Sequence, residues 1–456
     1  MKKNLRKLSA LLLALVMVLG MTGMAFADAD NVYEGSNNTL ATSMAGTASI
    51  PLNKTVVIFN TDDGTEVREP DIVFSYSVAK VDSTADEAAR LTGTITDDQN
   101  VTVTVYNGVV TGGAISNPSN ITYVNTNTVV ATTKGFEDEK STSISVDPTK
   151  FPHAGVYRYV ITESSDVTLA SVGMEAHTAA YDSTRYLDVY IYNPDYDAIT
   201  NTSGHQTLWM GGAVIFKSTS TDDSSPANTA SDAITATTDK TTGFEPGNNT
   251  PGSGANDYTN DETVDRYFTY NLDVTKKITG TLADKNHDFP FQISFTGALA
   301  HAVTVDVTNS SASPANTTLS ISTTPATDAA DLRNDETYSV TGLPKGTTVT
   351  VTEYNDTVDT YKLTTSFDGT TSTATKSNAA EGTTLATATG ETGVLINSGD
   401  ASNVKADKKT VLTFTNNLET ISPTGVVLRV APYMAILCGG IVLLALTKKR
   451  KADEEA

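Results

Sequence analysis

The sequence is dominated by short runs in which apolar and polar residues alternate with a period of two. Clear examples, bounded by Gly, Pro, Asn or Asp, are TVVIFN, VTVTVYN, GVYRYVITE, YLDVYIYN, YNLDVTKKI, FPFQISF, TVTVTEYN and TVLTFTNN. Such alternation is typical of β-strands that turn one face to a core. Long amphipathic helical patterns are absent from the sequence. Many short strands separated by turns predict an all-β fold of Ig-like sandwiches.

Length and local composition indicate how many sandwiches to expect. The 456 residues allow two or three domains, each with its own core. Between residues 218 and 263 the composition shifts to Ser, Thr, Asn, Asp, Gly and Pro, which is typical of a linker together with a weak last strand. We therefore expect two tandem domains outside the cell, 28–247 and 264–419.

Both ends of the chain carry targeting signals. Basic residues precede an apolar stretch that ends at Ala25-Phe26-Ala27. This pattern predicts a signal peptide, residues 1–27, cleaved after Ala27, and its small residues disfavour a retained membrane helix. Residues 426–447 form a second apolar stretch, followed directly by the basic residues 448–451. The segment 420–456 is thus expected to span the membrane with its tail in the cytoplasm.

Cysteine content and charge exclude several classes of function. The single cysteine, Cys438, lies in the second apolar stretch, so a covalent staple in the exported part must use other chemistry. A net charge of −22 excludes nucleic acid as a partner. The five histidines are dispersed, and phosphate-loop and nucleophile-elbow motifs are absent. We expect no metal, no cofactor and no turnover of a substrate.

Three polar residues sit on apolar faces of predicted strands. Lys276 shares a face with aliphatic residues in LDVTKKI, Glu353 does so in VTVTE, and Asn416 does so in VLTFTN. Because side chains alternate between the faces of a strand, all three are predicted to point into one core. Their burial is costly unless they satisfy one another. The alternative is that each merely caps a strand end.

A buried Lys-Glu-Asn cluster has a specific chemistry. Desolvation lowers the pKa of a lysine towards a neutral nucleophilic amine and raises the pKa of a glutamic acid. A protonated carboxyl can polarise the asparagine carbonyl, so that the amine attacks it and ammonia leaves. The product is an isopeptide bond that forms once, without a cofactor.

The second domain resembles the isopeptide-linkage domain of the Gram-positive backbone (major) pilins that sortases assemble. The resemblance is carried by LDVTKKITG (272–280), FPFQISF (289–295), GLPKGTTVTVTE (342–353) and LTFTN (412–416). It implies an autocatalytic triad in which Glu353 promotes a bond between Lys276 and Asn416.

The first domain resembles the N-terminal domain of the same pilins. IPLNKTVVIF places Lys54 on an apolar stripe, and FPHAGVYRYVITE places Glu163 at the end of another. The resemblance implies that these two residues are the lysine and the catalytic glutamate of this domain. The expected acceptor position in Phe244-Glu245-Pro246 holds proline. The alternative acceptors are Asn248, Asn249 and Asn260.

The tail of the chain resembles a pilin sorting signal. Its residues are Ser422, Pro423, Thr424 and Gly425, ahead of the apolar span and the basic tail. Proline fixes an exposed kink, and glycine leaves the scissile bond sterically open. The resemblance implies that sortase cleaves between Thr424 and Gly425 and joins Thr424 to a lysine of another subunit. Lys240 is at the comparable position in the family, and Lys217 is the second choice.

These observations lead to two hypotheses. The first is a structural subunit of a covalently polymerised pilus on the cell wall. Its implied partners are sortase, other copies in a head-to-tail polymer, minor pilins and peptidoglycan, with the membrane as a transient anchor. The second is a monomeric wall-anchored or pilus-tip adhesin that binds a host ligand.

Overall fold

The computed structural model describes the residues that form the strands and many of their connections. They are residues 46–96, 102–176, 183–192, 196–197, 202–203, 208–216, 240–244, 258, 264–297, 299–322, 324, 326–354, 361–367, 370–375, 384–391 and 410–419. The predicted signal peptide 1–27, the sorting segment 420–456 and most of 218–263 lie outside them. Among the described residues, no helix has the length and apolar character needed to cross a membrane.

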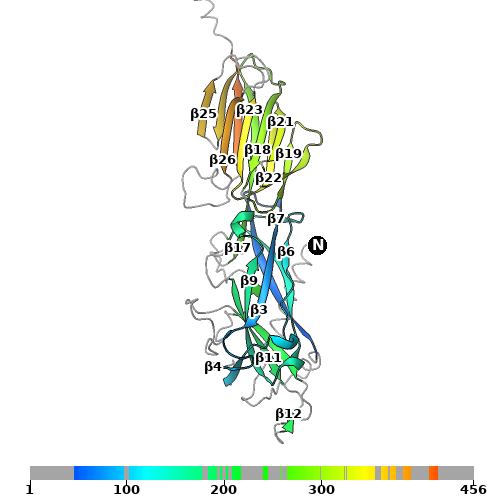
Figure 1. Ribbon diagram of the computed structural model, residues 1–456. Helices are drawn as coiled ribbons and strands as arrows, with labels where there is room; N and C mark the ends of the chain where they lie inside the picture. Colours follow the sequence, from blue (N-terminus) through cyan, green and yellow to red (C-terminus); the bar gives the residue numbers. More distant parts are fainter. Residues whose placement is uncertain are drawn as a thin grey trace, which may run out of the picture.

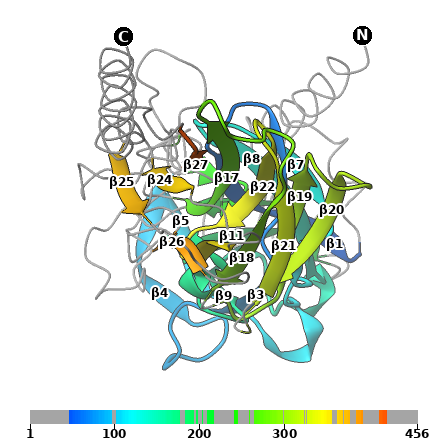
Figure 2. The ribbon, with the colours of Figure 1, turned by 90° about the horizontal axis from the view of Figure 1, so that it is seen from above.

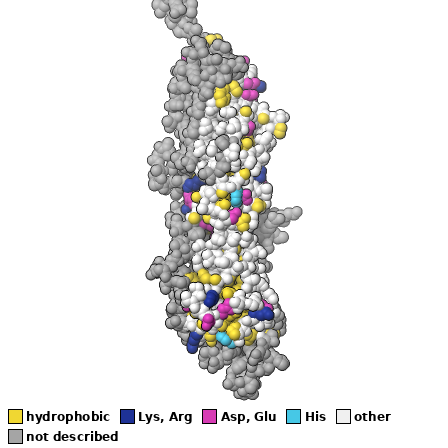
Figure 3. All heavy atoms as spheres, viewed as in Figure 1, with side chains coloured by type: hydrophobic (Ala, Val, Ile, Leu, Met, Phe, Trp, Pro, Cys, Tyr) yellow, Lys and Arg dark blue, Asp and Glu magenta, His cyan; other side chains and the backbone are white. Residues whose placement is uncertain are grey.

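The regular structure is almost entirely β. The exceptions in the described residues are three short 3₁₀ segments: η1 (Thr111–Gly113), η2 (Pro148–Lys150) and η3 (Leu169–Val172). The predicted all-β class is therefore confirmed. The strands form an elongated molecule with two hydrophobic cores, one in the N-terminal half and one in the C-terminal half (Figure 1). On the face seen in Figure 3, neutral polar side chains and backbone predominate, and charged and hydrophobic side chains form small scattered groups.

The N-terminal half is a sandwich of two layers. One layer is a sheet with the order β15-β14-β11-β9-β3-β6, to which β5 is added by pairing with β9 and with β4. Its strands are β3 (Ile72–Lys80), β4 (Arg90–Thr96), β5 (Thr102–Asn107), β6 (Ile121–Tyr123), β9 (Gly155–Ser165), β11 (Thr184–Tyr192), β14 (Trp209–Phe216) and β15 (Lys240–Thr241). Side chains from alternate positions of β3, β6, β9 and β11 enter the first core.

The opposing layer is built on β1 (Ala48–Asn60). It pairs antiparallel with β8 (Phe136–Val146), and the short β16 (Gly243–Phe244) lies parallel to it. Leu52 and Val56 of β1 are fully buried in the first core. Since Lys54 stands between them with the same two-residue period, its side chain enters that core as well.

The C-terminal half is a second sandwich. One layer has the order β20-β19-β22-β17-β27-β24-β25 and the other the order β21-β18-β23-β26, and the two face each other when viewed along the molecule (Figure 2). The strands of the first layer are β17 (Asp265–Thr279), β19 (Val303–Asn309), β20 (Asn316–Ile321), β22 (Thr337–Pro344), β24 (Lys362–Phe367), β25 (Thr370–Thr375) and β27 (Thr410–Asn417). Those of the second are β18 (Phe289–Thr296), β21 (Ala326–Leu332), β23 (Thr348–Tyr354) and β26 (Thr384–Glu391).

Five short strands complete the described structure. β2 (Thr65–Arg68) pairs with β7 (Thr128–Ala131), and β12 (Tyr196–Asp197) pairs with β13 (Thr202–Ser203). β10 (Met174–Glu175) pairs with the beginning of β17.

Strand β17 belongs to both halves. Its first five residues pair in parallel with the end of β1, from Val56 opposite Asp265 to Asn60 opposite Thr269. Farther along, β17 is flanked by β22 and by β27 of the C-terminal half. Tyr267 packs in the first core, whereas the following residue, Phe268, packs in the second. One strand therefore connects the two cores without an intervening loop.

Buried contacts fix the junction between the halves. Phe59 of β1 stacks on Phe268 of β17 with 4.7 Å between the ring centroids. Asn60 Nδ2 donates to Asn271 Oδ1 at 3.1 Å, and Asn271 Nδ2 donates back to Asn60 Oδ1 at 2.9 Å. Each buried amide thus satisfies the other, which removes most of the desolvation cost and fixes the register of β1 against β17.

Candidate cross-linking sites

Three side chains converge at the centre of the C-terminal half. Lys276 is on β17, Asn416 is on the neighbouring parallel strand β27, and Glu353 is on β23 in the opposite sheet. Lys276 Nζ lies 2.9 Å from Glu353 Oε1, and Asn416 Nδ2 lies 2.7 Å from the same oxygen. All three residues have 0% exposure. The residues that the sequence pattern placed on apolar stripes are thus brought together.

The surroundings of this cluster are aromatic. Lys276 Nζ lies 4.0 Å from the centroid of the Phe289 ring and 5.7 Å from that of Phe291. Phe291 in turn packs edge-on against Phe414. Such a site has a low local dielectric, and this strengthens every polar contact within it and makes unpaired charge costly.

The position of the Asn416 amide decides what chemistry is open to the cluster. Its Nδ2 donates to Glu353, and its Oδ1 is buried with no hydrogen-bond partner among the described residues. Half a turn of the amide would bring Oδ1 to Glu353, where a protonated carboxyl could donate to it. The amide carbon would then be polarised, with the lysine nitrogen close by.

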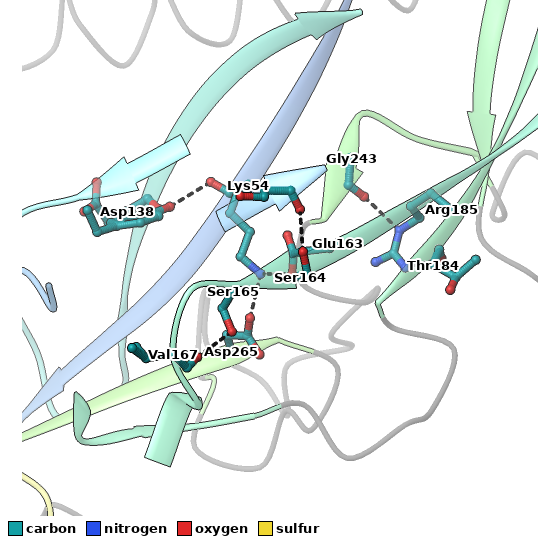
Figure 4. Close-up of polar contacts among 12 residues, drawn as sticks. Lys54, Asp138, Glu163, Ser164, Ser165, Val167, Thr184, Arg185, Gly243 and Asp265 are labelled. Atoms are coloured by element: carbon teal, nitrogen blue, oxygen red, sulfur yellow. Dashed lines mark hydrogen bonds and ion pairs between the residues drawn. The ribbon is translucent and has the colours of Figure 1, made fainter. Parts of the chain in front are cut away.

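A second cluster lies in the first core. Lys54 Nζ is 2.7 Å from Glu163 Oε1 and 2.6 Å from Asp265 Oδ2 (Figure 4). Lys54 is on β1, Glu163 is on β9 of the opposite sheet, and Asp265 is the first residue of β17. The ring of Phe74 lies 4.3 Å from Nζ. All three charged residues are buried.

Burial and charge act in opposite directions at this cluster. Burial alone would lower the pKa of the Lys54 amine, but the carboxylates of Asp265 and Glu163 outweigh it and raise that pKa. The pKa of Glu163 is raised, because its burial, reinforced by the charge of Asp265, outweighs the attraction of Lys54. Glu163 is thus the carboxyl suited to carry a proton.

Asp265 is the residue that sequence reasoning missed. It is the first residue of a strand whose later residues pack in the C-terminal core. The sequence signal that could have indicated its burial is its two-residue spacing from Tyr267, which packs in the first core. Reading that signal requires knowing that β17 begins in the other core.

Of the other residues predicted to form bonds or to be cleaved, only Lys240 is among the described residues. Lys240 is in β15, at the edge of its sheet, with its backbone opposite Phe216. The candidates Lys217, Asn248, Asn249, Asn260, Ser422, Pro423, Thr424 and Gly425 lie outside the described residues. In the described part of the chain, no group of three or more His, Cys, Asp or Glu side chains is placed to hold a metal ion.

The fold and these clusters define an all-β sandwich protein with lysine, carboxyl and amide groups inside its cores. A family model described as "Domain of unknown function (DUF7601)" matches residues 270–398. Over 191 residues the chain is 30% identical to a pilin of Streptococcus pyogenes serotype M1. This matching stretch covers 40% of this chain and 49% of that pilin. The chain thus spans about half the length of the curated relative it matches. It is related to the Gram-positive pilins, and the resemblance inferred from its motifs is confirmed.

The crystal structure of the major pilin from Streptococcus pyogenes is matched over 82% of this chain and 99% of that one, with 18% identity and a TM-score of 0.39. A pilus-presented adhesin is matched over 81% of this chain and 99% of that one, with 12% identity and a TM-score of 0.22.

Proposed function

We propose that the chain is a structural subunit of a covalently polymerised pilus on the cell surface, built from two Ig-like domains that correspond to the two halves. The observation that carries the proposal is the fully buried contact of Lys276, Glu353 and Asn416. A core that contains a lysine, an acid and an amide in mutual contact is suited to forming an internal cross-link. Kinship with a pilin supports the same conclusion.

The internal reaction joins Lys276 to Asn416. The lysine nitrogen attacks the amide carbon of Asn416, a new C–N bond forms, and the old amide nitrogen leaves as ammonia. Glu353 takes a proton from the lysine and delivers it to the leaving nitrogen. The oxygen of Glu353 that contacts both groups is placed for this transfer.

The cross-link would lie where tension acts on a shaft. β17 and β27 are parallel neighbours, and they are the first and last strands of the C-terminal half. A covalent bond between β17 and β27 transmits tension directly from the first strand to the last, so the hydrogen bonds of the intervening strands do not carry the load. It also limits the freedom of the unfolded chain, as a disulfide does, but it cannot be reduced.

Polymerisation is the second part of the proposal. Sortase cleaves between Thr424 and Gly425 and transfers the Thr424 acyl group to a lysine of the next subunit, which gives an open head-to-tail assembly. Lys240 is the proposed acceptor and Lys217 the second choice. Among the described strands β15 is at the edge of its sheet, and this supports Lys240, because an edge strand leaves one side open to a partner.

The experiment that tests polymerisation is an immunoblot of cell-wall extracts boiled in detergent. The proposal predicts a ladder of covalent multimers that Lys240→Ala abolishes, while Lys277→Ala, an exposed lysine of the C-terminal half, leaves it intact. Loss of the ladder in Lys217→Ala alone would move the acceptor to Lys217. A single band in the unmodified strain would contradict the shaft and favour the monomeric adhesin.

A further inference from the structure

We propose that Lys54 and Asp265 become joined by an isopeptide bond that forms with release of water. This inference does not depend on polymerisation, but its argument from topology rests on the Lys276–Asn416 bond proposed above. It assigns the acceptor in the N-terminal half to a carboxyl group rather than to an amide. The bond would also cross from the first core to the strand that carries Lys276.

The main evidence is that the two clusters have the same topology. Each lysine lies on a strand with a parallel neighbour, β1 beside β17 and β17 beside β27. In the first pair Asp265 is opposite Val56, and in the second Asn416 is opposite Ile278. Each acceptor is therefore opposite the residue two positions beyond the lysine. Asp265 occupies the place in the first cluster that Asn416 occupies in the second.

The rest of each cluster matches as well. The glutamates, Glu163 on β9 and Glu353 on β23, both come from the sheet opposite the lysine. The phenylalanines next to the lysines, Phe74 at 4.3 Å and Phe289 at 4.0 Å, are on strands paired with those of the glutamates, β3 and β18. Lysine, acid, acceptor and aromatic ring thus recur in one arrangement.

The cluster also differs from an ordinary salt bridge. Two carboxyl groups contact one lysine, although a single carboxylate would balance the charge of the ammonium group. Tyr76 adds a further buried polar group, because its hydroxyl interacts with the Glu163 carboxyl. A charged cluster left in this state is expensive to bury.

The reaction balances without any further reactant. The Lys54 ammonium and the Asp265 carboxylate have opposite charges, and their product is a neutral amide and one water. Nζ attacks the carboxyl carbon of Asp265, a C–N bond forms, and one C–O bond breaks. Of the three ammonium protons one stays on the amide, and Glu163 relays the other two, one at a time, to the departing oxygen.

Two physical effects favour this condensation inside the core. The amine and the carboxyl are held in contact, which replaces a bimolecular encounter by a high effective concentration. The product removes two charges from a buried site and leaves an amide, which is much less costly to bury than an ion pair. The water that is formed leaves the apolar interior for the solvent. Hydrolysis of the new amide, the reverse reaction, then has no water close by.

The test is peptide mapping by tandem mass spectrometry of the purified full chain. We expect the peptide that contains Lys54 to be joined to the one that contains Asp265, with a mass one water below the sum of the two. Asp265→Ala should abolish the joined peptide. Asp265→Asn should still give the joined peptide, but the bond should form with loss of ammonia instead of water, because an amide is the other acceptor that this chemistry uses.

Two further variants separate the chemistry from the fold. Glu163→Gln should leave Lys54 and Asp265 unjoined, since the proton relay is lost while the size of the side chain is kept. Asp306→Ala, which removes a carboxylate paired with Arg68 in the contact between the halves, should leave the bond intact. Recovery of Lys54 in an unjoined peptide of the unmodified chain would overturn the proposal. Joining of Lys54 to Asn248, Asn249 or Asn260 would do the same.

Discussion

Each buried lysine carries its charge into an aromatic core. The ammonium groups of Lys276 and Lys54 lie 4.0 Å and 4.3 Å from the centroid of a phenylalanine ring, just outside the 2.6–2.9 Å contacts with their carboxylate partners. Such rings offer some attraction to a cation, but far less than water does. Removing one partner from a buried ion pair typically costs about 3–5 kcal/mol. Conversion of the lysine into a neutral amide would remove that charge, so the proposed cross-link would lower the cost of burying the cluster.

The role of Glu353 can be tested by a substitution of equal size. Glu353→Gln keeps the hydrogen-bonding atoms but cannot relay a proton, so we expect Lys276 and Asn416 to remain unjoined. The protein should then retain one ammonia in this region. It should lose about 5 kcal/mol of stability, the size expected for a covalent loop on the order of a hundred residues. Peptide mapping and thermal unfolding measure the two effects.

The matched control for this experiment is the neighbouring lysine. Lys277 points away from the core and pairs with Asp335 at the surface. Lys277→Ala should keep the bond and change the stability by less than about 1 kcal/mol. If the joined peptide persists in Glu353→Gln, the carboxyl is not needed and the proposed reaction is wrong.

At the scale of elements, the register between β17 and β27 brings the lysine close to its acceptor. The two strands are in register from Leu272 opposite Thr410 to Thr279 opposite Asn417. Just beyond, Gly280 has a φ of 102°, and a Cβ there would lie 2.1 Å from the backbone oxygen of Leu418. Only glycine accepts both the conformation and the contact. Gly280 therefore allows the chain to turn tightly beside the end of β27.

Gly280→Ala is expected to displace the end of β27 relative to β17. The strain and the overlap together should destabilise the protein by about 2–3 kcal/mol and slow the formation of the Lys276–Asn416 bond. Gly64→Ala is the control, because Gly64 also has a positive φ, 78°, but open space around its Cβ position. Thermal unfolding and the joined fraction in freshly made protein measure the difference. Equal effects from both variants would show that the contact with Leu418 is unimportant.

Sequence periodicity predicted the strands and one cluster well, for a physical reason. Lys276, Glu353 and Asn416 each end a stripe within a single core, so alternation alone places them inside. Asp265 could not be found in this way. It begins a strand whose even-numbered positions enter the second core, while its own neighbour Tyr267 enters the first. Local alternation predicts which side chains share a face of a strand, but it does not predict which of the two cores that face enters. For the beginning of β17, the core is determined by the pairing of β17 with β1.

At the scale of the molecule, the two proposed bonds meet on one strand. Asp265 is at the beginning of β17 and Lys276 is near its end. The order of linked elements would be β1, β17 and β27, so each core is closed by a bond between parallel neighbours. Contacts at the junction, such as the paired amides of Asn60 and Asn271, hold the two cores in a fixed relation. This arrangement suits a subunit that transmits tension along its long axis (Figure 1).

The mechanical consequence can be measured by pulling single molecules. We expect a chain tethered through residues 240 and 424, the points that the proposed polymer would use, to show no release of the segment between Lys276 and Asn416. Asn416→Ala removes the acceptor, so unfolding should then release that segment, with a gain of roughly 50 nm at about 3.5 Å per residue. Asn417→Ala is the matched control, because this neighbouring amide is only half-buried and donates to Glu419 rather than to Glu353. A long release from the unmodified chain would show that the sheets, and not a covalent bond, resist the load.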